Sequence, residues 1–344
     1  MDRRLRPWLG ALAWSLAWVA PGAAADFYSG KTITLNVANT AGCGYDIYAR
    51  LLGRYLGKYI PGEPNIVVKN QPGAGGKVMS NEMYNKVVPD GLTIGMMARD
   101  NPLEPVLGVA AARFTAEGFT WLGTMSSYAD DAYGLVIRAD SHVKNIEDAR
   151  KSGPPLVFGG IAFGETSADI ILIARAVFRL NLRLVVGYPG SPDINIAIQR
   201  GEIDGRAIGI SSVQATMGDW WNAGKLRYLV QFGRQTRLAA IADVPTAQEL
   251  AIGAEDKALV DFAEVPFRIA RPFVAPPNVP ADRAAILKRA FMDCQRDPAF
   301  LKEARDMQLD ISPLSGDEVH DLVARIAHTP PSVVQHYKDI LASK

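Results

Sequence analysis

Short apolar segments that are typical of strands alternate with helical segments along most of this chain, and this alternation constrains the fold more than any other feature. It predicts an α/β protein whose sheets are mostly parallel. The expected strands fall into two sets of about five, which is a common sheet size. They are Ile33–Ala38, Asn65–Asn70, Thr93–Ala98, Trp121–Met125 and Arg268–Ala275 in the first set, and Leu135–Arg138, Leu156–Gly159, Leu182–Val186, Arg206–Ile210 and Arg227–Gln231 in the second.

The order of the two sets along the chain predicts two lobes. The chain crosses into the second set near Met125–Tyr133 and returns between Phe232 and Pro266, so that the last strand completes the first sheet. Two crossings make a two-strand hinge, and a cleft between hinged lobes is a favoured place for a ligand. We expect the amphipathic helices after Pro277 to cover lobe one. The expected division is residues 26–125 with 233–344 for lobe one and residues 126–232 for lobe two.

The first residues have the features of an export signal. A charged start precedes an apolar stretch from Trp8 to Ala20, and Ala23-Ala24-Ala25 fits a small-residue cleavage site. We therefore expect residues 1–25 to be a cleaved signal peptide and the mature protein to be exported to the periplasm. An uncleaved anchor is the alternative, although the stretch is short for spanning a bilayer.

Composition excludes several function classes. The formal net charge is +1 and no acidic or basic tail is present, so nothing indicates a nucleic acid as partner, and we expect a monomer. The G-x-S-x-G, H-E-x-x-H, P-loop and C-x-x-C motifs are missing, which argues against an enzyme and against a cofactor. The four histidines lie mostly near the end of the chain and predict no metal site. We expect Cys43 and Cys294 to be free, although an exported protein can form a disulfide.

A glycine-containing segment joins the first expected strand to a helix expected over Asp46–Tyr59. Its glycines permit a sharp turn with free N–H groups, and the helix adds the positive end of its dipole, so the segment predicts a seat for an anion. A tight turn without a ligand is the alternative, and a dinucleotide-binding loop is disfavoured because Ile47 occupies the third glycine position. The candidate ligand-binding residues here are Ala41, Gly42, Cys43, Gly44, Tyr45 and Asp46, with Asp46 expected to cap the helix and shape the loop.

Lobe two offers similar segments. A glycine-rich loop follows the strand at Leu156–Gly159 and leads into a helix, a second strand ends at a Tyr-Pro-Gly sequence, and a third begins after an acidic turn. These residues would hydrogen-bond a ligand from the opposite side of the cleft, or they are a helix cap and turn residues only. The candidates are Phe163, Gly164, Thr166, Ser167, Tyr188, Gly190 and Asp204.

Taken in order, these segments resemble the Bug-type substrate-binding receptors of tripartite tricarboxylate transporters. The first loop resembles that family's Gly-Gly-x-x-Asp loop, and it is followed by a similar Ala-Arg-Leu-Leu helix start at Ala49–Leu52. The other similar segments are Asn70-Gln71-Pro72-Gly73-Ala74-Gly75-Gly76, Pro89-Asp90-Gly91-Leu92-Thr93, Tyr188-Pro189-Gly190, Asp243-Val244-Pro245-Thr246 with Glu249, and Ala275-Pro276-Pro277.

The resemblance implies a type II-like periplasmic binding protein that closes on a small carboxylate and delivers it to membrane permease subunits. It further implies that loop amides and water hold the carboxylate, here at Ala41–Asp46 and Phe163–Ser167. Two departures from the family pattern remove positive charge: Glu165, Ala168 and Asp169 at the lobe-two loop, and Pro189 in place of a lysine. The ligand is therefore left open among a dicarboxylate, a monocarboxylate, an aromatic acid and a zwitterion. A ligand-sensing module that feeds a signalling system is one alternative function, and an exported α/β enzyme is another.

Overall fold

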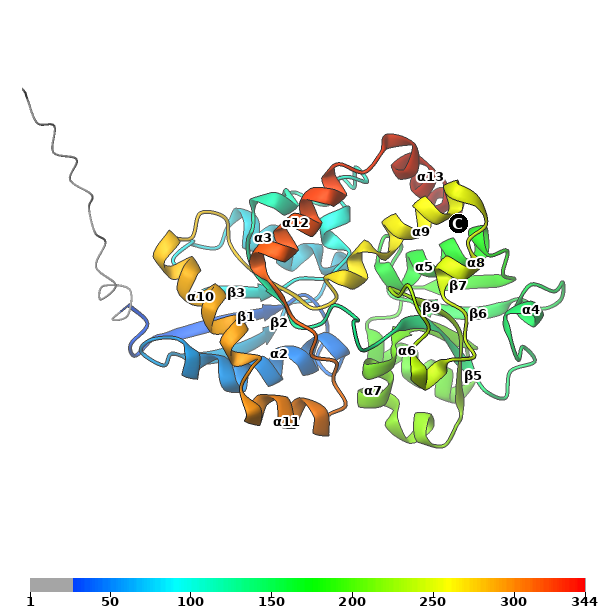
Figure 1. Ribbon diagram of the computed structural model, residues 1–344, viewed down its shortest axis with the longest axis horizontal. Coiled ribbons are helices and arrows are strands. Elements are labelled where there is room, and N and C mark those ends of the chain that lie inside the picture. Colours follow the sequence, from blue (N-terminus) through cyan, green and yellow to red (C-terminus); the bar gives the residue numbers. More distant parts are fainter. Residues whose placement is uncertain (1–26, 344) are drawn as a thin grey trace, which may run out of the picture.

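The computed structural model describes residues 27–343 and contains two lobes, each built around one mixed β-sheet with helices on its faces (Figure 1). The signal peptide expected at residues 1–25 lies outside the described residues. Within the described part, no helix is long and apolar enough to cross a bilayer.

The sheet of lobe one has six strands in the order β11-β4-β10-β3-β1-β2. β1 runs parallel to both β2 and β3, whereas β10 is antiparallel to β3 and β4, and β11 is antiparallel to β4. The bounds are β1 Thr32–Val37, β2 Asn65–Asn70, β3 Thr93–Met96, β4 Thr120–Thr124, β10 Pro272–Ala275 and β11 Leu314–Ser315.

The sheet of lobe two has five strands in the order β7-β6-β8-β5-β9. β6 is parallel to β7 and β8, and β5 is antiparallel to β8 and β9. The bounds are β5 Tyr133–Arg138, β6 Leu156–Gly160, β7 Leu182–Val186, β8 Gly205–Gly209 and β9 Leu226–Phe232.

The two-lobed α/β fold class is confirmed, but the sheets are mixed rather than mostly parallel. The antiparallel pairings involve β5 and β10, the first strands after each crossing, together with β11. A strand that enters a sheet from the other lobe arrives from the opposite direction to one that follows a local crossover helix. Apolar periodicity does not encode this direction. Residues 268–271 were expected in the last strand but lie outside it, since α9 ends at Arg268 and β10 begins at Pro272.

Helices flank both sheets. In lobe one they are α2 Gly44–Tyr55, α3 Lys77–Asn85, α10 Ala281–Cys294, α11 Pro298–Asp306 and α12 Gly316–Ala327. In lobe two they are α4 Ile146–Ala149, α5 Thr166–Val177, α6 Ser191–Arg200, α7 Ile210–Asn222, α8 Ala247–Leu250, α9 Gly253–Arg268 and α13 Pro331–Ala342. Short 3₁₀ turns lie at Leu56–Tyr59, Ala74–Gly76, Asn101–Leu103, Ala116–Gly118 and Ala239–Ile241.

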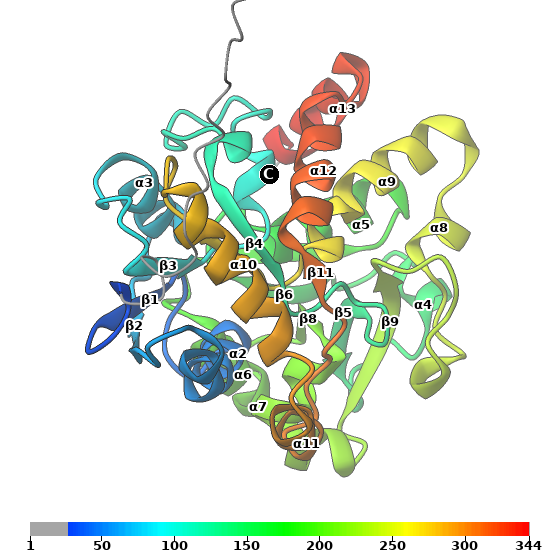
Figure 2. The same cartoon turned by 60° about the vertical axis from the view of Figure 1, so that its left-hand side comes forward.

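The packing of the later helices differs from the sequence expectation. α10 and α12 pack on β4 of lobe one as expected, but α13 packs on α5 and α9 (Figures 1 and 2). α8 contacts β9, and α9 contacts α5, so these two helices also lie on lobe two although residues 233–344 were expected in lobe one. The cause is apolar: Phe262 of α9 and Tyr337 and Ile340 of α13 join the core cluster that surrounds α5. The chain therefore passes between the lobes a third time after α12.

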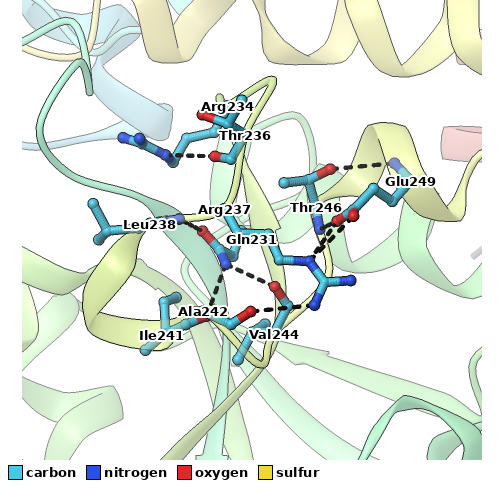
Figure 3. A network of polar contacts seen from close by, with 10 residues as sticks. All are labelled: Gln231, Arg234, Thr236, Arg237, Leu238, Ile241, Ala242, Val244, Thr246 and Glu249. Atoms are coloured by element: carbon cyan, nitrogen blue, oxygen red, sulfur yellow. Dashed lines mark hydrogen bonds and ion pairs between the residues drawn. The ribbon is translucent and has the colours of Figure 1, made fainter.

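The segment after β9 is held by the polar network drawn in Figure 3. The side-chain amide of Gln231 donates to the carbonyls of Ile241 and Val244 over 3.0 and 2.7 Å. Thr246 and Glu249 form a capping box at the start of α8, in which each side chain bonds the other residue's backbone N–H. The Asp-Val-Pro-Thr motif with its later glutamate is thus explained by local structure.

Candidate functional site

A cavity of about 50 Å³ lies between the lobes, where β1, β3, β6 and β8 end. A wider hollow of about 490 Å³ beside the hinge is more open, and its Arg268 and Arg325 side chains are exposed. We consider the smaller cavity the candidate site because its charged groups are buried. It is lined from lobe one by Asn39, Cys43, Gly44, Tyr45, Arg99 and Arg271, and from lobe two by Tyr133, Ile161, Glu165, Ser167, Ser191, Arg206, Ile208, Gly209 and Ser212.

Four helices begin at this cavity, because each follows a strand or turn that ends at its edge. Gly44 opens α2, Ser167 lies in the first turn of α5, Ser191 opens α6, and Ser212 lies in the first turn of α7. The N-terminus of a helix carries unpaired N–H groups and a partial positive charge. Four such ends make the cavity favourable for an anion.

Three buried arginines add full positive charges to the same cavity. Arg99 follows β3, Arg271 precedes β10 and Arg206 lies within β8, and their exposed fractions are 5%, 2% and 4%. Because β10 runs antiparallel to β3, its first residue lies at the edge where β3 ends, which brings Arg271 near Arg99. Among the described residues, none of the three forms an ion pair with a carboxylate.

The hydrogen-bond partners of these arginines are neutral. Arg99 Nη1 donates to the Tyr128 hydroxyl at 3.0 Å, Arg271 Nη2 donates to Ser212 Oγ at 2.9 Å, and Arg206 Nη1 donates to Asn195 Oδ1 at 2.7 Å. The Nε atoms of Arg206 and Arg271 are buried without a partner. Buried donors are normally satisfied, so these two indicate space for an acceptor.

Aromatic rings hold two of the guanidinium groups in place. The guanidinium carbon of Arg99 lies 4.3 Å from the centre of the Tyr133 ring, and that of Arg271 lies 4.9 Å from Tyr45 and 4.7 Å from Tyr48. A guanidinium over a ring face is attracted by the ring's quadrupole. Burial raises the pKa of Tyr45 and of Tyr133, so both phenols stay neutral and do not cancel the positive charge.

The two ligand loops expected from the sequence share one construction. Gly42 and Gly164 both have a left-handed backbone, with φ of 76° and 79°, and each donates its N–H to an aspartate in the first turn of the following helix. Gly42 bonds Asp46 at 2.9 Å and Gly164 bonds Asp169 at 3.0 Å. Asp46 therefore shapes its loop, as expected, but the residue at the N-cap position of α2 is Cys43, and Asp46 does not line the cavity although it was a candidate ligand-binding residue.

The two aspartates differ in charge environment. Asp46 is buried, which opposes its ionisation, but its bonds from Arg50, Gly42 and Asn70 lower its pKa. In the described part of the chain Asp169 has no cationic partner, and burial raises its pKa to about 7. The lobe-one loop is thus held by a stable carboxylate, and the lobe-two loop by a group that titrates near neutrality.

The structure brings only some of the expected site residues to the cavity. Cys43, Gly44, Tyr45 and Ser167 line it. The others from the two loops lie behind or beside these four and do not line it: Ala41, Gly42, Asp46, Phe163, Gly164 and Thr166. Gly190 contacts the other lobe instead, since a methyl group there would lie 2.3 Å from Thr40 Oγ1.

Two expected residues lie elsewhere. Asp204 precedes β8, at the opposite end from the cavity-lining Gly209, and its carboxylate accepts the N–H of Val157 at 2.7 Å. It is a turn carboxylate, which was the alternative interpretation. Tyr188 packs against the apolar cluster around Ile194 and is not part of the lining.

Sequence reasoning missed the three arginines, and it expected a loss of positive charge at this site. The available signal was an arginine inside or directly beside an apolar strand, as in Gly205–Gly209. Glu165 does line the cavity, as a single acid that accepts the Ser167 hydroxyl, whereas Asp169 does not.

The described residues offer little for metal or thiol chemistry. They include no group of three or more histidine, cysteine or acidic side chains placed to hold a metal ion. Cys43 and Cys294 are both buried and free, as expected. Burial raises the pKa of the Cys43 thiol, so it is a poor nucleophile although it lines the cavity.

Comparison with known proteins gives consistent results. A curated UPF0065 protein of Bordetella bronchiseptica is 23% identical over 286 residues, covering 83% of this chain and 79% of that protein. The periplasmic binding protein BugD has a similar fold, with a TM-score of 0.70 at 17% identity over 91% of this chain and 98% of that one. MatC of Rhodopseudomonas palustris, solved with bound malate, has a TM-score of 0.67 at 18% identity over 91% and 99%. The model of the tripartite tricarboxylate transporter family receptors matches residues 56–337, and the chain belongs to this family of solute-binding receptors.

Proposed function

We propose that this protein is a periplasmic receptor that captures a small carboxylate-bearing ligand between its lobes and delivers it to the permease subunits of a tripartite tricarboxylate transporter. The family membership and the two-lobed fold support the receptor role. The malate bound to MatC makes a carboxylate a reasonable ligand class. We also propose that residues 1–25 are removed on export and that the protein acts as a monomer without enzymatic activity.

One observation carries the ligand assignment: Arg99, Arg206 and Arg271 are buried around one cavity, and no carboxylate of residues 27–343 forms an ion pair with them. A buried charge that is not paired is strongly unfavourable. Glu165 supplies one negative charge in the lining, which leaves the lining itself with two more positive than negative charges. An anion with two negative charges would balance them, so a dicarboxylate is favoured over a monocarboxylate, an aromatic monoacid or a zwitterion.

Contacts between the lobes support capture by closure. The bond from Arg271 of lobe one to Ser212 of lobe two crosses the cavity, and Thr40 packs against Gly190 on the opposite lobe. Since both lobes supply charges to the cavity, a bound anion would stabilise the closed arrangement more than the open one.

Calorimetric titration tests the proposal, with the mature protein and pairs of acids matched in length. Succinate and malate are expected to bind, and butyrate, which lacks one carboxylate, is expected to bind at least tenfold more weakly, a difference of about 1.4 kcal/mol. Recovery of the unchanged acid after incubation would support a receptor. Equal affinity for succinate and butyrate would overturn the dianion assignment, and a chemically altered product would overturn the receptor role.

Uptake measurements distinguish a transport receptor from a sensing module. Deletion of the gene is expected to abolish uptake of the bound acid, and a mutant of the permease is expected to have the same defect. Normal uptake with a lost transcriptional response to the acid would favour a sensing module.

A further inference from the structure

The tail helix α13 packs against α5, the helix whose first turn lies at the cavity. It follows α12 of lobe one, passes over Pro330-Pro331, and packs on α5 and α9 of lobe two (Figure 2). Tyr337 on its buried face is 4% exposed, and its ring meets Phe262 of α9 edge-on with centroids 5.3 Å apart. This contact places a phenol hydroxyl at the first turn of α5.

The Tyr337 hydroxyl donates to Oδ2 of Asp169 at 3.2 Å, and Oδ1 of the same carboxylate accepts the Gly164 N–H at 3.0 Å. Gly164 directly precedes the cavity-lining Glu165, and Ser167 follows in the same segment. Two consecutive hydrogen bonds therefore connect the tail helix to the loop that forms the lobe-two wall of the cavity.

We propose that Tyr337 is a positioning residue for ligand binding, which holds the Gly164 turn through Asp169 and so fixes Glu165 and Ser167 at the cavity; this inference rests on the proposed receptor function. In lobe one the corresponding aspartate, Asp46, receives bonds from Arg50 and Asn70. In lobe two, Tyr337 is the side chain that bonds Asp169 within the described residues, so the tail helix takes the place of those local partners.

The surroundings of Asp169 give the positioning role a signature in pH. Glu165 on the same loop and Glu104 after β3 of lobe one repel the negative charge of Asp169. The charge of Asp100 helps to raise the pKa of the Tyr337 phenol, and Lys77 forms an ion pair with Glu104. Burial is the larger effect, and the pKa of Asp169 is about 7. A protonated Asp169 still accepts the Gly164 N–H and removes one negative charge near the anion site. Affinity for an anion should therefore fall as the pH rises through neutrality.

The test uses the mature protein with malate as the probe, titrated at about pH 6 and about pH 8. Tyr337→Phe removes only the hydroxyl, and we expect about tenfold weaker malate binding, typical of a lost hydrogen bond to a charged group. Phe262→Leu is the matched control, because it loosens the same α9–α13 contact and leaves the hydroxyl in place. It should keep wild-type affinity within about twofold. Asp169→Asn should flatten the pH dependence of malate affinity.

Amide hydrogen exchange at Gly164, followed by NMR without ligand, tests the positioning independently of any ligand. We expect faster exchange in Tyr337→Phe than in the wild type and in Phe262→Leu. Equal loss of affinity in both variants would reduce α13 to a packing role, and unchanged exchange at Gly164 in Tyr337→Phe would overturn the inference. If the wild type binds neither malate nor succinate, the proposed function fails, and the exchange at Gly164 still decides the inference.

Discussion

A methyl group at Gly44 is expected to hold the two lobes apart. Gly44 opens α2 in lobe one, and a Cβ atom there would lie 2.6 Å from Ser212 Oγ and 3.3 Å from Ser212 Cβ, both in α7 of lobe two. The backbone of Gly44 is not left-handed, so Gly44→Ala strains neither the turn nor α2 itself. The clash arises only where the lobes meet, and opening the hinge relieves it.

The magnitude follows from the size of the overlap. Extra atoms forced into a packed contact typically cost about 1–3 kcal/mol. Since the open form does not contain the overlap, the whole penalty is added to the free energy of closing the lobes. Ligand affinity should therefore fall by about 5- to 150-fold. The unfolding free energy of the ligand-free protein should change little.

Titration with malate or succinate measures the loss, and solution scattering at saturating ligand reports whether the lobes close. Gly218→Ala is the matched control, because it adds the same methyl group on α7 with nothing within 4 Å. The double variant Gly44→Ala with Ser212→Ala removes the oxygen at 2.6 Å and should bind more tightly than Gly44→Ala alone. Wild-type affinity in Gly44→Ala would refute the closed geometry described here.

Three further predictions concern charge and access at the site. Arg206→Gln should weaken dianion binding by at least about thirtyfold, the low end for losing one partner of a buried charged pair, as measured by calorimetry. It should also raise the melting temperature of the ligand-free protein, because an unpaired buried charge is removed, as measured by thermal unfolding. The unfolding free energy should fall as the pH rises from about 4 to about 7, because burial raises the pKa of Asp169, Glu104 and Glu264 to about 7. The native state therefore binds more protons than the unfolded chain over this range. Urea unfolding at the two pH values tests the sign, and a rise in the unfolding free energy would contradict it. Ligand should slow alkylation of the cavity-lining Cys43 by iodoacetamide, as followed by mass spectrometry, and equal rates with and without ligand would place the ligand elsewhere.

Strand positions were predictable where apolar β-branched runs end at turn residues. β2 and β7 have the bounds Asn65–Asn70 and Leu182–Val186 that the sequence indicated. α9 was not predicted, because Pro266 lies within it and its first turns are rich in charged residues. The tail helices were found from their apolar stripes, but a stripe does not say which partner it will meet, and α13 packs on lobe two.

The loops of the candidate site were predictable, and its charges were not. A glycine that permits a left-handed turn before a helix leaves a local signature, which is why the segments at Gly42 and Gly164 could be found. An arginine inside or beside an apolar strand is a weaker signal, because most arginines lie on the surface. Its burial depends on which strands become neighbours.

The pair formed by Arg99 and Arg271 illustrates this dependence. β10 pairs with β3 in a register that sets Phe273 opposite Met96, and the Met97 N–H donates to the Pro272 carbonyl at 3.0 Å. Arg99 lies just after β3 and Arg271 just before β10, so this register places both arginines at the same edge of the sheet. Two like charges brought together in a buried place destabilise the fold unless something compensates them. Within the described residues no carboxylate forms an ion pair with either of them, and the nearby Tyr45 and Tyr133 are neutral. The register of one antiparallel strand pair therefore places unpaired positive charge in the closed cleft, and an anionic ligand would neutralise it.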